Sequence, residues 1–100
     1  LVYDLKKYYP QQFAQFQRNC FKTQKEYIRR YLEMGQQAGL VRANLNIELV
    51  AGLFAKIHSD AIRDIEEIEG HGYNMHQFGY TVMDVFVRGV LSEEGMKLYN

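Results

Sequence analysis

Residues 34–51 read MGQQAGLVRANLNIELVA and mark where one helix ends and another begins. Gly39 follows a stretch of helical periodicity and is well placed to adopt the left-handed conformation that ends a helix. Asn46 then precedes Ile47 as a side-chain cap, with Glu48 in the first turn, where the helix dipole favours a negative charge. The second helix is apolar almost all round. This segment therefore predicts a helical hairpin whose second helix needs packing partners on more than one side.

Pro10, the only proline, separates a short first helix from a long one. Proline disfavours the α conformation at the residue before it, so the first helix should end near Tyr8. Pro10 itself suits the first turn of the next helix. That helix is expected over residues 11–38, because apolar side chains recur there at intervals of three, four or seven.

Two further long helices are predicted downstream. One is expected over residues 47–67. The other begins after Asn74, whose spacing to Gln77 is that of a capping box, and runs to about residue 91. Ser92 is then in position to cap one short terminal turn. No useful length of the chain alternates with a period of two, so the sequence predicts an all-α fold.

The last two long helices have apolar faces that are too wide for one packing partner. At about 100° per residue, the apolar face centred on Phe86 covers roughly 200°, and the face around Phe54 is similar. A helix on one side of a monomer needs little more than about 100°. Three long helices are too few to cover both faces, whereas a second copy of the chain could, so we expect a symmetric homodimer. The residues predicted at its interface are Leu49, Leu53, Phe78, Val82, Val85, Phe86 and Gly89.

Composition and charge narrow the class of protein. The 100 residues are 47% apolar and carry no net charge, with +5 in residues 1–42 and −5 in residues 43–100. A nucleic-acid-binding domain normally has a net basic surface, so the two halves read as solvated faces of opposite sign. Cys20 is the only cysteine, which excludes an intrachain disulfide and favours a reducing, cytoplasmic location. No apolar run approaches the roughly 20 residues that a membrane span needs.

The sequence offers little catalytic chemistry. It has no glycine-rich phosphate loop, no Gly-x-Ser-x-Gly elbow and no His-Glu-x-x-His pair. Cys20 and His58 could form a nucleophile and base, but Cys20 lies on an apolar face, where a buried structural thiol is far commoner. His71 and His76 flank a glycine loop without a third metal ligand at suitable spacing. We therefore expect no enzyme activity, no cofactor and no metal.

A small-molecule site is the remaining possibility. Phe16, Cys20, Tyr27, Phe54 and His58 form a row that is expected to face inward between the first and second long helices. Such a row would bind a small apolar or amphipathic effector, because ligand cavities combine apolar walls with a few polar groups. His58 is either one of those polar groups or a core histidine that is satisfied by a hydroxyl or carbonyl. The sequence leaves both readings open.

Three segments resemble the regulatory domains of TetR-type (TetR/AcrR) bacterial transcription factors. EMGQQAGLVRANLNIELVAGLF, residues 33–54, resembles a junction of that family in which an apolar-apolar-Arg turn precedes a helix opening like NIELVA. VFVRGVLSEEGMKLY, residues 85–99, is similar to the family's ending, with a glycine in the last long helix and a Ser-Glu-Glu-Gly restart. VYDLKKYYPQQFAQF, residues 2–16, is similar to a helix break in one branch.

The resemblance implies a function for the whole chain. In that family an N-terminal helix-turn-helix domain reads operator DNA, and a helical domain binds an effector and dimerises. The last two long helices of each subunit form a four-helix bundle across the two-fold axis. The chain begins at Leu1 without a helix-turn-helix, so residues 1–100 are expected to be the C-terminal regulatory domain, contacting DNA only through the missing N-terminal domain. The alternative is a stand-alone helical interaction module or a small helical enzyme.

Overall fold

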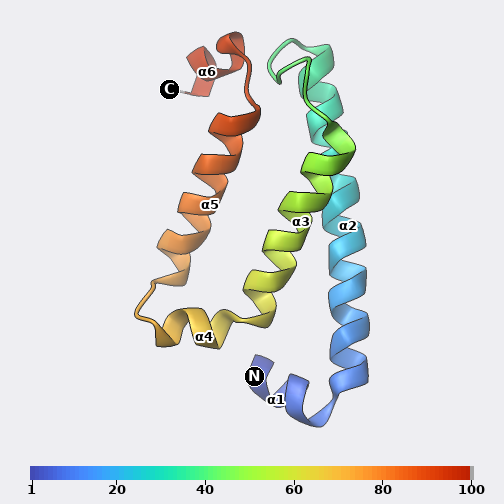
Figure 1. Ribbon diagram of the computed structural model, residues 1–100, viewed down its shortest axis with the longest axis vertical. Coiled ribbons are helices and arrows are strands. Elements are labelled where there is room, and N and C mark those ends of the chain that lie inside the picture. The colour runs from blue at the N-terminus through green and yellow to red at the C-terminus, as the bar shows by residue number, and fades with distance from the viewer. Residues whose placement is uncertain (100) are drawn as a thin grey trace.

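The computed structural model describes residues 1–99, and these are helical almost throughout (Figure 1), which confirms the all-α prediction. The described residues form no strand; an isolated bridge pairs Val41 with Leu91. The helices are α1 (Val2–Tyr8), α2 (Pro10–Gln37), α3 (Ile47–Arg63), α4 (Ile65–Gly70), α5 (Met75–Val90) and α6 (Glu93–Tyr99).

Most of the predicted helix ends are confirmed. Pro10 is the first residue of α2, and Gly39 takes a φ of 77° just after that helix. The Asn46 side chain accepts a hydrogen bond of 3.1 Å from the Leu49 backbone N–H and so caps α3. Asn74 caps α5 in the same way, through backbone N–H groups of its first turn. Each of these features is set by residues within a few positions of the helix end.

The prediction of one helix over residues 47–67 is wrong. The chain breaks at Asp64, where α3 ends and α4 begins at a different angle (Figure 1). At this break the Lys6 ammonium group of α1 donates a hydrogen bond to the Arg63 carbonyl oxygen, and the Arg63 guanidinium pairs with the Asp64 carboxylate. A contact with a side chain 57 residues earlier lies outside any local periodicity.

Small side chains set the contact between α2 and α3. Ala51 and Ala55 of α3 are fully buried, and Ser59, at the same spacing of four, is buried with them. Residues four apart share one helix face, so this stripe lets the α2 backbone approach α3 closely. Gln17 of α2 adds a hydrogen bond of 2.9 Å to the Ser59 carbonyl oxygen.

Ala55→Leu should therefore force α2 and α3 apart. Three extra carbon atoms at a fully buried position require backbone shifts, and we expect a loss of about 1–3 kcal/mol in the free energy of unfolding. Urea denaturation followed by circular dichroism measures the change. Ala43→Leu, in the exposed turn before α3, is the control and should stay within about 0.5 kcal/mol of the wild type. Equal stability of the two variants would mean that the stripe does not set the helix spacing.

A set of backbone contacts fastens the end of α5 to the turn between α2 and α3. The Arg42 N–H donates to the Val90 carbonyl oxygen, and the Ser92 N–H donates to the Leu40 carbonyl oxygen, both at 2.9 Å. The Ser92 hydroxyl donates to the Gly39 carbonyl oxygen at 2.6 Å and accepts from the Gly95 N–H, so it caps α6 as predicted. Two of the three segments that carry the family resemblance, residues 33–54 and 85–99, therefore meet in space.

The helices form a plate with little interior. Its extents are 47 × 28 × 15 Å, and its radius of gyration is 15.7 Å, whereas a compact chain of this length has about 13 Å. Its accessible surface is 7299 Å², whereas a compact chain of 11.8 kDa exposes about 5,900 Å², an excess of about 1,400 Å². Within residues 1–99 six apolar residues are buried, and no large side chain is fully buried. Many large apolar side chains, among them Leu49, Leu53 and Val85, are therefore exposed on this single layer.

Candidate ligand cavity and interface groove

A cavity of about 510 Å³ lies between α3 and α5, with α2 contributing one wall. No Lys, Arg, Asp or Glu side chain lines it, and its polar side chains are those of Gln24 and His58. The cavity is therefore uncharged, with two neutral hydrogen-bonding groups among apolar walls. Its lining residues are Gln24, Ile28, Phe54, Ile57, His58, Ala61, Ile62, Ile65, Met75, Phe78, Gly79, Val82 and Met83.

The His58 side chain is exposed toward this cavity. It has no hydrogen-bond partner within residues 1–99. It is therefore not bonded to a hydroxyl or carbonyl, as a buried core histidine would be. Its imidazole is free to donate to or accept from a ligand. The core reading of His58 is therefore wrong, and its role as a polar contact for a ligand stays a prediction.

The five residues predicted to bind an effector do not converge on one site. Phe54 and His58 line the cavity. Phe16 is 53% exposed, Tyr27 is 57% exposed and Cys20 is half-buried, and none of these three lines the cavity. The expectation that Phe16 and Tyr27 face inward is wrong, because the close contact between α2 and α3 turns neighbouring positions of α2 toward α3. A role in ligand binding for these three residues stays a prediction.

The cavity also has walls that the sequence analysis missed. Gln24 and Ile28 form its α2 side, one turn apart on the same helix face. Met75 and Met83 contribute flexible side chains from α5. The sequence of α2 contains a signal for Gln24 and Ile28, because they continue the helical spacing that starts at Gln17. Nothing in the sequence nearby indicates which face of α2 lies toward α5.

A second, apolar groove of about 370 Å³ lies beside the cavity, where α3 and α5 touch. The rings of Phe54 and Phe86, on which the two wide apolar faces were centred, stack with centroids 3.9 Å apart. Thr81 has the one polar side chain of the lining. We call this surface the interface groove; it consists of Val50, Leu53, Phe54, Ile57, Thr81, Val82, Val85 and Phe86.

The structure gathers most of the predicted interface residues at this groove. Leu53, Val82, Val85 and Phe86 line it, and Leu49 is exposed one turn before Leu53 on α3. Phe78 lies further along α5 and lines the cavity instead. Gly89 is exposed, and a Cβ atom there would meet nothing within 4 Å, which leaves room for a close neighbour.

Ion pairs with shifted pKa values lie away from the cavity. Hydrogen bonds from Arg29 and then Arg30 lower the pKa of the exposed Glu26 to about 2. On α5 the Tyr99 hydroxyl, followed by Arg88, holds the pKa of Asp84 below its usual value and fixes α6 to the outer side of α5. These pairs occupy solvated surfaces and leave the cavity and the interface groove without charge.

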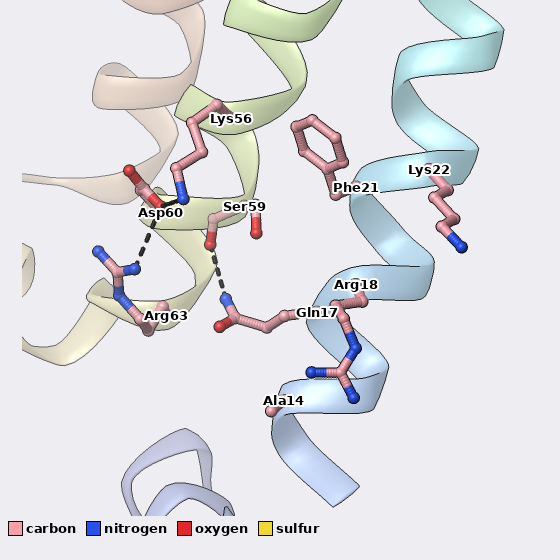
Figure 2. Close-up of a pocket in the computed structure, with 9 residues that line it drawn as sticks. All are labelled: Ala14, Gln17, Arg18, Phe21, Lys22, Lys56, Ser59, Asp60 and Arg63. Atoms are coloured by element: carbon pink, nitrogen blue, oxygen red, sulfur yellow. Dashed lines mark hydrogen bonds and ion pairs between the residues drawn. The ribbon is translucent and has the colours of Figure 1, made fainter. Parts of the chain in front are cut away.

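Four cations, Arg18, Lys22, Lys56 and Arg63, line a third groove, which the sequence analysis did not predict. It has a volume of about 470 Å³ and lies between α2 and α3 (Figure 2). Its lining residues are Ala14, Gln17, Arg18, Phe21, Lys22, Lys56, Ser59, Asp60 and Arg63. The cations come from two helices, so neither segment shows a basic cluster by itself.

Comparison with known proteins gives no match: no protein-family model matches the chain, and no curated protein or solved structure does so either. Within residues 1–99 no helix combines the length and apolar character needed to cross a membrane. In the same part of the chain, no three His, Cys, Asp or Glu side chains gather in a way that could hold a metal ion.

Proposed function

We propose that this chain is the effector-sensing and dimerisation region of a TetR-like transcriptional regulator. The observation that carries the proposal is the interface groove, an almost wholly apolar surface across α3 and α5 that a single chain leaves open to water. Exposed apolar patches of this kind mark interaction sites in soluble proteins. A second copy of the chain would cover this surface with its own interface groove, because a two-fold axis makes both subunits use the same residues.

The exposed area supports an obligate dimer. Covering an excess of about 1,400 Å² on each of two chains would bury about 2,800 Å² in total, within the range of obligate homodimers. In the proposed dimer, α3 and α5 of each subunit pack into a four-helix bundle across the two-fold axis. The residues at its centre are those of the interface groove, with Leu49 and Gly89 at its margins.

The family assignment is supported by where the resembling segments lie. One backbone hydrogen bond, from the Ser92 N–H to the Leu40 carbonyl oxygen, joins the apolar-apolar-Arg turn at Leu40–Arg42 to the Ser-Glu-Glu-Gly restart at Ser92–Gly95. Two further bonds lie at the edges of these motifs, from the Arg42 N–H to the Val90 carbonyl oxygen and from the Ser92 hydroxyl to the Gly39 carbonyl oxygen. Two motifs that are separate in the sequence are thus in contact, as expected if both belong to the sequence pattern of one domain. We propose that operator DNA is bound only through an N-terminal helix-turn-helix domain, in the cytoplasm, and that the chain catalyses no reaction.

The cavity between α3 and α5 is the proposed effector site. Its apolar walls favour an apolar or amphipathic compound, and Gln24 and His58 supply the hydrogen bonds that fix one polar end. Because α3 and α5 form both the cavity and the proposed bundle, a bound effector would act on the helices that set the geometry of the dimer. This shared use of two helices would link effector binding to release of DNA.

A thermal-shift screen of uncharged apolar and amphipathic compounds tests the effector site. A ligand at a hundredfold excess over its Kd should stabilise the folded chain by about 2.7 kcal/mol. His58→Ala should weaken the stabilisation by each hit, because the polar end of the ligand loses its partner. His76→Ala, an exposed histidine outside the cavity lining, is the matched control. Hits whose stabilisation is the same in both variants would place the effector elsewhere.

A further inference from the structure

The groove between α2 and α3 is separate from both surfaces described above. It shares no lining residue with the effector cavity or with the interface groove. On α3 it uses Lys56, Ser59, Asp60 and Arg63, whereas the cavity uses Phe54, Ile57, His58, Ala61 and Ile62. At about 100° per residue these sets occupy opposite flanks of the helix. A ligand could therefore occupy this groove in the proposed dimer as well as in a monomer.

Positive charge is in excess along the groove. Arg18, Lys22, Lys56 and Arg63 line it together with a single carboxylate, that of Asp60. Asp60 lies 3.4 Å from the Lys56 ammonium and 3.2 Å from the Arg63 guanidinium and holds both on the α3 side (Figure 2). No carboxylate within residues 1–99 pairs with Arg18 or Lys22, which extend from the α2 side. Because Arg63 also pairs with the Asp64 carboxylate beside the groove, the excess is two positive charges, those of Arg18 and Lys22.

The floor of the groove is apolar and fixed. Phe21 points from α2 into the space between the helices, and Ala14 lies two turns earlier on the same side (Figure 2). Gln17 spans the groove and donates to the Ser59 carbonyl oxygen at 2.9 Å, so the two walls are tied together. An apolar floor below a rim of cations suits a ligand with both an apolar and a negatively charged part.

We infer that this groove binds an amphipathic organic anion, with one carboxylate or phosphate head and a short apolar tail. The head lies beside Arg18 and Lys22, where the Arg18 guanidinium can offer N–H donors to its oxygens. Lys56 and Arg63 add positive charge from the α3 side while they stay paired with Asp60 and Asp64. The tail lies against Phe21 and Ala14. A neutral compound with the same tail gains the apolar contact but no charge-assisted bond, so the groove discriminates by charge.

Isothermal titration of the 100-residue chain with three matched compounds tests the inference. Octanoate and octyl phosphate carry the two candidate heads, and 1-octanol is the neutral control; all are used below micelle-forming concentrations. We expect both anions to bind at least about tenfold more tightly than 1-octanol, because octanol makes no ion pair. The ratio of the two anion affinities tells which head the groove prefers. Amide NMR shifts should change in α2 and α3.

Charge variants locate the site. Arg18→Gln combined with Lys22→Gln should weaken octanoate binding by about five- to tenfold, since two solvent-exposed contacts are lost. Arg30→Gln combined with Lys97→Gln removes the same net charge elsewhere and should leave the affinity unchanged. Circular dichroism checks that both proteins are folded. Equal affinities in the two double variants, equal binding of octanol and octanoate, or shifts confined to α5 would each overturn the inference. None of these outcomes bears on the dimer.

Discussion

A Val85→Glu variant should be a folded monomer. Val85 is 66% exposed in the single chain and lines the interface groove, so a glutamate there stays hydrated and leaves the subunit intact. In a two-fold dimer the same substitution buries two unpaired carboxylates, each at a cost of several kcal/mol. Gel filtration with light scattering should therefore give half the wild-type mass, and circular dichroism should show unchanged helix content.

Two variants on the same helix sharpen this test. Gln77→Glu adds the same charge at an exposed position outside the groove and should remain dimeric. Val82→Glu places the charge at a half-buried residue that lines both the groove and the cavity, so the subunit itself should lose stability. A wild-type chain that is monomeric at concentrations on the order of tens of micromolar would reject the dimer. It would then favour an interaction module that uses the same groove for another protein.

The wide apolar faces could be predicted from the sequence because they follow from the helical spacing of apolar residues. Spacing alone centres these faces on Phe54 and Phe86, and the centroids of the two rings lie 3.9 Å apart. Leu53 and Val85 follow from the same 100° step. Periodicity gives the width of a face, however, and does not say which part of it meets a neighbour within the chain. That division needed the structure, which separates Phe78 in the cavity from Val85 in the groove.

Features that depend on contacts between residues far apart in the sequence could not be predicted from it. The break between α3 and α4 involves Lys6, which no local rule connects to Arg63. The rotation of α2 depends on how closely Ala51 and Ala55 let it approach α3. For that reason Gln24 reaches the cavity whereas Tyr27, three residues later, faces solvent. The cation-lined groove has the same origin, because it exists only when two separate helices lie side by side.

Gly95→Ala should be among the most destabilising small substitutions in the chain. Gly95 is buried in α6, and a Cβ atom there would overlap the Leu40 carbonyl oxygen and press on the Leu91 side chain. The carbonyl cannot move aside without loss, because it accepts the hydrogen bond from the Ser92 N–H. We expect the free energy of unfolding to fall by about 3 kcal/mol, and urea denaturation measures it.

Two other glycines make the test specific to backbone contact. At Gly35 a Cβ would overlap a methyl group of the Val41 side chain and not a backbone atom, so Gly35→Ala should cost less than Gly95→Ala. At Gly70, the last residue of α4, a Cβ meets nothing within 4 Å, and Gly70→Ala should stabilise the chain by about 0.5–1 kcal/mol through helix propensity. If Gly95→Ala were as stable as Gly70→Ala, α6 would not be fastened to the turn between α2 and α3. Limited proteolysis near residues 91–95 would then cut the wild type as readily as the variant, because the joint that holds α5 in the plate would already be open.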